Sequence, residues 1–238
     1  MTSPFKHQQY SLDFCEPRDI VFDMSEPGTG KTPVHLWNFQ RQHRASRKAG
    51  IVLATKSLLD SAWAHDAAIF TPELRVSIAW AEHRQKAFET EADLYIVNHD
   101  GAKWLSEQPP SFLKRFGHGI VDESTAFKHA NSQRSKALKK IRRYWDTAAF
   151  LSGQCMPNGV LDVWNQACLL DGGKRLGSSY YQFRNTVCNP EQDGEDARSI
   201  KWVGKPGAEI ASAARLADIS ILHRLDECVD MPEKIVRA

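Results

Sequence analysis

The stretch Ser25-Glu26-Pro27-Gly28-Thr29-Gly30-Lys31-Thr32 contains the most informative motif of this chain. The pattern Gly-x-Gly-Lys-Thr is what a phosphate-binding loop needs, because small residues let backbone N–H groups turn toward an anion while a lysine and a hydroxyl complete the site. The strict motif has another glycine five residues before Gly30, where this sequence has Ser25. The loop alone is therefore also compatible with a plain glycine turn in front of a helix.

The flanking segments favour the phosphate-binding interpretation. Residues 19–24 are apolar and β-branched enough to form a strand, and residues 33–48 can form a helix. A phosphate-binding loop needs this strand, loop and helix context. We therefore expect Gly28, Thr29 and Gly30 to offer backbone donors, with Lys31 and Thr32 completing the site.

The rest of the chain alternates between apolar runs and helical patterns. Such alternation predicts a parallel sheet covered by helices on both faces, so the expected fold class is α/β. The polar stretch 189–198 looks like an exposed excursion. Strands are expected at 50–55, 94–98, 119–121 and 147–153, with a weaker candidate at 76–80, and helices at 5–15, 58–70, 132–143, 161–170 and 207–225.

Two adjacent carboxylates, Asp122 and Glu123, follow the expected strand at 119–121. Carboxylates at the carboxyl end of a buried strand are costly unless they bind something, and open α/β sheets place their ligands there. Asp-Glu pairs are also common on protein surfaces. Together with the loop at Lys31, however, this pair predicts that Asp122 holds Mg²⁺ through a water and that Glu123 deprotonates the water that attacks a γ-phosphate.

Composition limits the possible partners. The chain has 238 residues, 42% of them hydrophobic and 25% charged, with a net charge of +2. Affinity for nucleic acid would therefore have to come from local patches and not from a bulk field. No apolar run approaches the ~18 residues of a membrane span, and the five cysteines lack a Cys-x-x-Cys pair, so we expect no membrane partner, no zinc site and a reducing cytoplasm.

The helical stretch 132–143 carries six positive charges. A run of this kind is most often a solvated helix face. It is also suited to contacts with phosphate groups, which would make nucleic-acid binding more sensitive to salt. Both interpretations stay open at the level of sequence.

The order of these motifs resembles the first RecA-like domain of superfamily-two helicases, most closely the Swi/Snf-type DNA translocases, which include short phage-encoded versions. The resemblance extends over nearly the whole chain. Residues 5–8 look like the adenine-reading motif and residues 25–32 like motif I, in which a small residue often replaces the first glycine. Residues 52–56 and 96–100 resemble the strand-end motifs, and residues 121–124 with 127–128 resemble motif II.

The resemblance implies a single RecA-like domain over 1–238, a three-layer sandwich with a mainly parallel sheet that binds Mg²⁺ and ATP. Gln8 would read adenine, Lys31 would neutralise the β- and γ-phosphates, Thr32 and Asp122 would hold Mg²⁺, and Glu123 would activate water. Nucleic acid, with DNA favoured, would be contacted mainly through its backbone. The residues expected near it are Thr55, Lys56, Asn98, His99 and Lys128, for each of which a surface or helix-cap role fits equally well.

Residues 151–159 resemble motif III, in which Ser152 and Gly153 would help to couple hydrolysis to movement. The family normally has Thr-Pro where this chain has Gln154-Cys155, so we expect weakened or altered coupling. Residues 224–232 resemble the segment that closes the first domain. The second RecA-like domain, which supplies arginine fingers worth about 10³–10⁵ in rate in related enzymes, would have to come from elsewhere.

Three functions follow from this sequence. The first is the ATP-binding half of a DNA-dependent translocase or helicase, completed by a second domain or a partner protein. The second is a module that binds nucleotide, nucleic acid or a partner without appreciable turnover, which the altered Gln154-Cys155 favours. A small-molecule phosphotransferase is disfavoured, because nothing after motif III suggests a lid or an acceptor pocket. The expected location is the cytoplasm, or the host cytoplasm if the chain is phage-encoded.

Overall fold

The computed structural model describes residues 3–192 and 200–228 and has a seven-stranded sheet at its centre. The strand order is β3-β4-β2-β5-β6-β1-β9, and every pairing between these strands is parallel. The predicted α/β class is therefore confirmed. The strands are β1 (Ile20–Asp23), β2 (Ala49–Ala54), β3 (Val76–Ala79), β4 (Leu94–Asn98), β5 (Phe116–Val121), β6 (Thr147–Leu151) and β9 (Ser220–Ile221).

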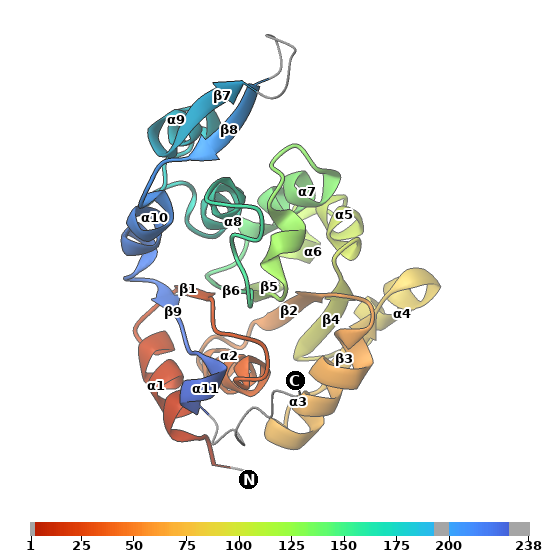
Figure 1. Cartoon of the computed structure of the whole chain (residues 1–238). Helices are drawn as coiled ribbons and strands as arrows, with labels where there is room; N and C mark the ends of the chain where they lie inside the picture. The colour runs from red at the N-terminus through yellow and green to blue at the C-terminus, as the bar shows by residue number, and fades with distance from the viewer. Residues whose placement is uncertain (1–2, 193–199, 229–238) are drawn as a thin grey trace, which may run out of the picture.

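Helices cover both faces of the sheet, which gives the three layers that the sequence predicts (Figure 1). Two separate apolar cores result, one on each face, and the central strands are buried from both sides. One face carries α1 (Lys6–Cys15), α2 (Lys31–Ser46), the π-helix η1 (Leu59–Ala64) and α3 (His65–Phe70). The other carries α4 (Arg84–Glu89), α5 (Gly101–Ser106), α6 (Pro110–Leu113), α7 (Gln133–Arg142) and α8 (Leu161–Asp171), and the short 3₁₀ turns are η2 (Ala81–His83) and η3 (Ser124–Phe127).

The sequence prediction of one helix over 207–225 is wrong beyond Leu216. Helix α10 (Ala208–Leu216) ends there, and the chain then forms β9 beside β1. The backbone N–H groups of Phe22 and Met24 donate to the carbonyls of Ile219 and Ile221. Because buried N–H groups must find acceptors, strand pairing at this edge outweighs the helical tendency of the segment.

A second difference concerns the polar stretch 189–198. Residues Cys188–Gln192 form β7, which pairs antiparallel with β8 (Ile200–Gly204), so a hairpin stands where only an exposed excursion is expected. Residues 189–192 are exposed as predicted, and 193–198 lie outside the described residues. The hairpin and α9 (Tyr180–Val187) project away from the sheet at the top of Figure 1.

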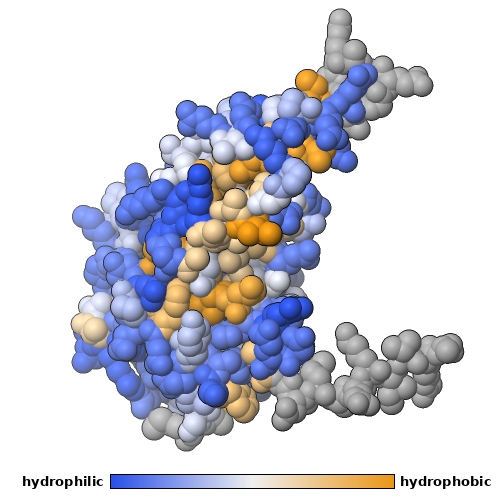
Figure 2. All heavy atoms as spheres, turned by 60° about the vertical axis from the view of Figure 1, so that its left-hand side comes forward, coloured by the Kyte–Doolittle hydropathy of each residue, from blue (hydrophilic) through white to orange (hydrophobic). Residues whose placement is uncertain are grey.

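Apolar side chains form a band on the side of the molecule where α10 and β9 lie (Figure 2). Ile210 on α10 and Leu222 just after β9 are 77% and 64% exposed. Exposed apolar surface of this kind is typical of faces that contact another domain or protein. Within residues 3–192 and 200–228, no helix has the length and apolar character to cross a bilayer.

Candidate nucleotide site

The loop between β1 and α2 has the backbone conformation that phosphate binding needs. Gly28 and Gly30 have φ angles of +85° and +75°, in the left-handed region that glycine adopts without strain. A Cβ on Gly30 would also lie 2.3 Å from Nε2 of Gln8. The loop leads directly into α2, whose first residues, Lys31 and Thr32, have N–H groups with no acceptor inside the helix. A helix start of this kind favours a bound anion.

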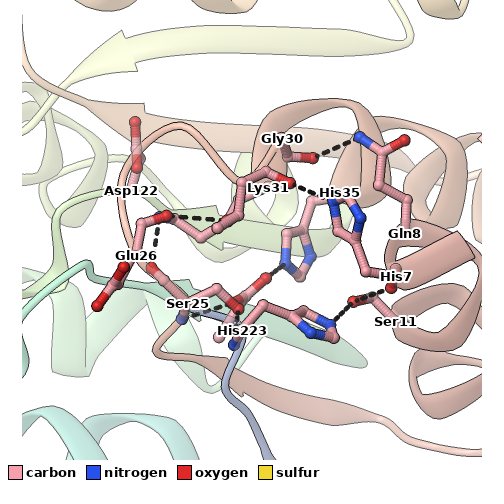
Figure 3. A network of polar contacts seen from close by, with 12 residues as sticks. His7, Gln8, Ser11, Ser25, Glu26, Gly30, Lys31, His35, Asp122 and His223 are labelled. Atoms are coloured by element: carbon pink, nitrogen blue, oxygen red, sulfur yellow. Dashed lines mark hydrogen bonds and ion pairs between the residues drawn. The ribbon is translucent and has the colours of Figure 1, made fainter. Parts of the chain in front are cut away.

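Lys31 is the first residue of α2, and its side chain folds back onto the preceding loop. Its Nζ donates to the carbonyl oxygens of Ser25 at 2.6 Å and of Glu26 at 3.0 Å (Figure 3). The positive charge is thus held beside the left-handed glycines and the start of α2. Phosphate oxygens are the acceptors that this combination of ammonium and backbone N–H groups suits best.

Ser25 occupies the position where the strict motif has a glycine, and its hydroxyl takes part in a hydrogen bond that glycine could not form. Its Oγ accepts the N–H of His223, which follows β9. Glu26 adds two links to the same segment, because its N–H donates to the carbonyl of His223 and its carboxylate accepts the N–H of Leu225. The segment after β9 therefore fixes the first half of the loop. Nothing in the sequence signals these long-range contacts.

Helix α1 packs against the second half of the loop. The side-chain amide of Gln8 accepts the N–H of Phe5 at 2.9 Å and donates to the carbonyl of Gly30 at 3.2 Å. Nε2 of His7 donates to the carbonyl of Thr29 at 2.9 Å (Figure 3). Gln8 therefore contacts the loop through Gly30, and its adenine-reading role stays a prediction. The contact of His7 is one that the sequence analysis missed.

Asp122 and Glu123 follow β5 at the same edge of the sheet. Asp122 Oδ2 accepts the indole N–H of Trp63 at 2.8 Å, and its Oδ1 accepts the N–H of Glu123 at 3.0 Å. Glu123 has a φ of +47°, one of three positive values at non-glycine positions in the described residues. Such strain is often found at functional positions. Burial and the neighbouring carboxylate of Asp122 raise the pKa of Glu123, which the charge of Lys31 partly opposes.

The oxygen ligands at this site suit Mg²⁺, which needs few protein ligands, better than a metal ion that is coordinated by protein side chains alone. Thr32 offers a hydroxyl and Asp122 a carboxylate, both hard ligands of the kind that Mg²⁺ prefers. Among the described residues, no three His, Cys, Asp or Glu side chains gather as a metal-binding group. Mg²⁺ commonly uses one or two protein oxygens and completes its shell with water and phosphate.

The predicted coupling residues pack against the end of β1 and the phosphate-binding loop. The N–H of Ser152 donates to the carbonyl of Asp23 at 2.9 Å, and the serine is almost fully buried. A Cβ on Gly153 would lie 2.8 Å from Cδ of Pro27. Residues 152 and 153 therefore pack on the end of β1 and on the loop 25–32, and the approach to Pro27 leaves no room for a side chain at Gly153.

The predicted nucleic-acid residues have different surroundings. Lys56 is exposed and lies over the ring of Trp80 at 4.3 Å, and Thr55 beside it is partly exposed. Asn98 accepts a hydrogen bond from Arg84. His99 is buried and its Nε2 donates to the carbonyl of Asp122, while burial lowers the pKa of its imidazole. Lys128 forms an ion pair with Asp162 at 3.0 Å.

Comparison with known proteins shows relatives for parts of the chain, although no family model matches it. A stretch of 168 residues is 32% identical to "Putative protein p41" of Acyrthosiphon pisum secondary endosymbiont phage 1 and covers 66% of this chain and 36% of that protein. Another, of 149 residues, is 25% identical to an uncharacterized ATP-dependent helicase of Mycoplasma genitalium and covers 59% of this chain and 14% of that protein. The chain thus spans well under half the length of both relatives.

Solved structures show which fold this is. The Sulfolobus solfataricus SWI2/SNF2 ATPase core in complex with dsDNA superposes with a TM-score of 0.72 at 17% identity, over 96% of this chain and 47% of that one. The same archaeal ATPase core domain alone gives 0.68, also at 17% identity, over 94% of this chain and 44% of that one. The chain therefore has the RecA-like fold found in SWI2/SNF2 ATPase cores, as the order of its motifs predicts.

Proposed function

We propose that this chain, with the fold of a SWI2/SNF2 ATPase core, is the ATP-binding lobe of a nucleic-acid-dependent ATPase. In this proposal Mg²⁺-ATP hydrolysis drives movement on DNA once a second lobe completes the site. The sequence relative named as an ATP-dependent helicase and the structural neighbour bound to dsDNA both support this class of function.

One observation carries the proposal. The loop that holds Lys31 follows β1 and the strained Glu123 follows β5, so both lie beyond the carboxyl ends of strands in the same parallel sheet. A base and a phosphate-binding cation in this relationship suit attack by water on a terminal phosphate. A loop that served only as a helix start would not need a strained carboxylate beside it.

Each residue has a task in this mechanism. The N–H groups of Gly28 to Thr32 and the ammonium of Lys31 bind and neutralise phosphate oxygens. Thr32 and Asp122 would hold Mg²⁺, which when bound offsets charge on the phosphates. Trp63 fixes the rotamer of Asp122 through its indole N–H. Glu123 accepts the proton of the attacking water, and its raised pKa makes it a stronger base than an exposed glutamate.

The nucleic acid would lie along the carboxyl ends of β2 and β4. Among the predicted contact residues, Lys56 is exposed and Thr55 beside it is partly exposed, so we assign phosphate contacts to these two first. Asn98 is also partly exposed, but its side chain already accepts a hydrogen bond from Arg84. His99 and Lys128 already bond to Asp122 and Asp162. In our proposal His99 and Lys128 hold neighbouring residues of the site in place and do not contact the nucleic acid. The chain spans part of its relatives, so the second lobe or partner is part of the proposal.

A second candidate is a module that binds nucleotide without turnover. The observation that favours it is the pair Gln154-Cys155, which replaces the Thr-Pro of the family that the chain resembles. Hydrolysis of ATP by the purified chain, with and without duplex DNA, separates the two functions. Stimulation by DNA that disappears in Glu123→Gln supports the ATPase. Binding of ATP with no turnover under either condition supports the module.

A further inference from the structure

Gln166 is a fully buried polar residue on α8, and its side chain lies between Ser124 and Cys155. Its Oε1 accepts the hydroxyl of Ser124 at 2.6 Å, and Ser124 directly follows Glu123. Its Nε2 donates to the carbonyl of Cys155 at 2.8 Å. A buried amide is costly unless its groups are bonded, and here both ends are used. Gln166 therefore ties the residue after the expected base to the loop 152–158.

A second link runs parallel to the first. Asp162 lies one helical turn before Gln166 on α8, and its Oδ2 accepts Nζ of Lys128 at 3.0 Å. The same oxygen accepts both the backbone N–H and the side-chain amide of Asn158, at 3.0 and 3.1 Å. Residues four apart on a helix project from the same side, so α8 joins η3 to the loop 152–158 at two points.

The loop 152–158 also reaches the phosphate-binding loop. Gly153 packs on Pro27, and the thiol of Cys155 lies 3.3 Å from the sulfur of Met24. Continuous contacts thus run from the phosphate-binding loop through residues 152–158 and α8 to Glu123. The link at Cys155 uses its backbone carbonyl, which any residue type supplies. The replacement of Thr-Pro by Gln154-Cys155 therefore leaves this connection intact.

We propose that Gln166 is a positioning residue that holds Glu123 in register with the phosphate-binding loop and transmits the state of that loop to residues 124–128. This inference rests on the proposed function, because it assigns Gln166 a role in ATP turnover. Gln166 is fully buried, and the proposal assigns it no contact with nucleotide. It acts through Ser124 and through the carbonyl of Cys155.

The first test compares nucleotide affinity with the rate of a single turnover in Gln166→Leu. Hydrolysis should fall by at least tenfold, because small displacements of a catalytic group cost up to about 100-fold. The dissociation constant for Mg²⁺-ATP should change less than about twofold, since the phosphate-binding loop is untouched. Gln182→Leu, an exposed glutamine on α9, is the matched control and should change neither.

Two milder variants guard against a general loss of folding. Ser124→Ala removes only the bond to Oε1, and Gln166→Met keeps the length and volume of the side chain while removing its bonds to Ser124 and Cys155. Both should slow turnover with thermal midpoints near that of the wild type. A rate in either variant equal to that of the wild type would overturn the inference.

Amide hydrogen exchange provides a readout that does not depend on turnover. Mg²⁺-ATPγS should slow exchange in residues 124–128 and 152–158 of the wild type. In Gln166→Leu the protection of 124–128 should be lost, while that of the phosphate-binding loop remains. Equal protection of 124–128 in both proteins contradicts the inference and leaves the proposed function standing. A wild type that binds no nucleotide overturns the proposed function itself, together with this inference.

Discussion

The carboxylate of Asp23 accepts a hydrogen bond from Nε2 of His35 at 3.0 Å, and both side chains are almost fully buried. Asp23 ends β1 and His35 lies one turn into α2, so the pair joins the two elements that flank the phosphate-binding loop. The other carboxylate oxygen accepts the N–H of Ser25. Burial alone would raise the pKa of Asp23, but the bonds from His35 and Ser25 more than offset this and lower it.

Removal of this carboxylate should destabilise the fold. Asp23→Ala leaves His35 and the N–H of Ser25 without their acceptor, and breaking a buried pair in this way costs about 3–5 kcal/mol. Urea unfolding at pH 7 measures the loss. Asp13→Ala, at an exposed position on α1, is the control and should cost less than about 1 kcal/mol. Similar losses of unfolding free energy in both variants would show that the bonds from Asp23 to His35 and Ser25 do not stabilise the fold.

The contribution of Asp23 should also depend on pH. Because its folded-state pKa lies below the ordinary value, its stabilising effect is fully present above that value and is lost as the pH falls through the folded-state pKa. The difference in unfolding free energy between wild type and Asp23→Asn should be constant near neutral pH and shrink below about pH 4. A difference that grows with acidity would contradict this sign.

Gly30 and Gly172 form a matched pair for testing the loop. Their φ angles are +75° and +74°, but a Cβ on Gly30 meets Gln8 whereas one on Gly172 meets open space. Substitution by alanine should strain both backbones by about 1–2 kcal/mol. Only Gly30→Ala should also displace Gln8 and weaken Mg²⁺-ATP binding, by tenfold or more. Calorimetric titration of both variants checks this, and equal affinities would place Gln8 and Gly30 outside the nucleotide site.

Glu123 should titrate above an ordinary glutamate in the metal-free protein. Burial and the neighbouring carboxylate of Asp122 raise its pKa, whereas Mg²⁺ beside Asp122 would act in the opposite direction. In the chain without Mg²⁺ or nucleotide, carbon-13 NMR of the Glu123 carboxyl should therefore give a midpoint above about pH 4.3, the ordinary value. A midpoint at or below that value would contradict the raised pKa.

The basic stretch of α7 can be tested through salt dependence. Lys136, Lys139 and Lys140 are exposed, and no carboxylate in the described part of the chain pairs with them. If they contact DNA phosphates, replacing all three by alanine should reduce the slope of log affinity against log salt by about 2–3. The control replaces the exposed Lys86, Lys103 and Lys114. An unchanged slope would make this side of α7 a solvated face.

Local patterns were sufficient to predict the centre of the fold. The strands before the phosphate-binding loop and before Asp122 are short and apolar, and their parallel direction in one sheet follows from the helices between them. The order of the strands in the sheet was not predicted. The placement of Lys31 and Asp122 beyond the carboxyl ends of their strands follows in the same way, whereas Gln8 was singled out only by the family resemblance. These features depend on residues close together in sequence, which is why periodicity and motif spacing reveal them.

Long-range contacts account for what could not be predicted. The segment after β9 reaches Ser25 and Glu26 from about 200 positions away, and the bridge through Gln166 joins three distant segments. A buried histidine such as His35 has no pattern that separates it from a surface one. Residues 200–203 include the strand-forming types Ile, Trp and Val, which are a local signal for β8. The polar composition of 189–198 gave no matching signal for β7, so the hairpin was not predicted.

The most direct test of the account is calorimetric titration of Mg²⁺-ATP into the wild-type chain and into Lys31→Ala. Lys31→Met serves as a second variant that keeps the length of the side chain. We predict one site in the wild type and no measurable binding in either variant, because the phosphate groups lose the ammonium of Lys31, the only lysine in residues 25–32. Equal affinity in all three proteins, or no binding to the wild type, would contradict it.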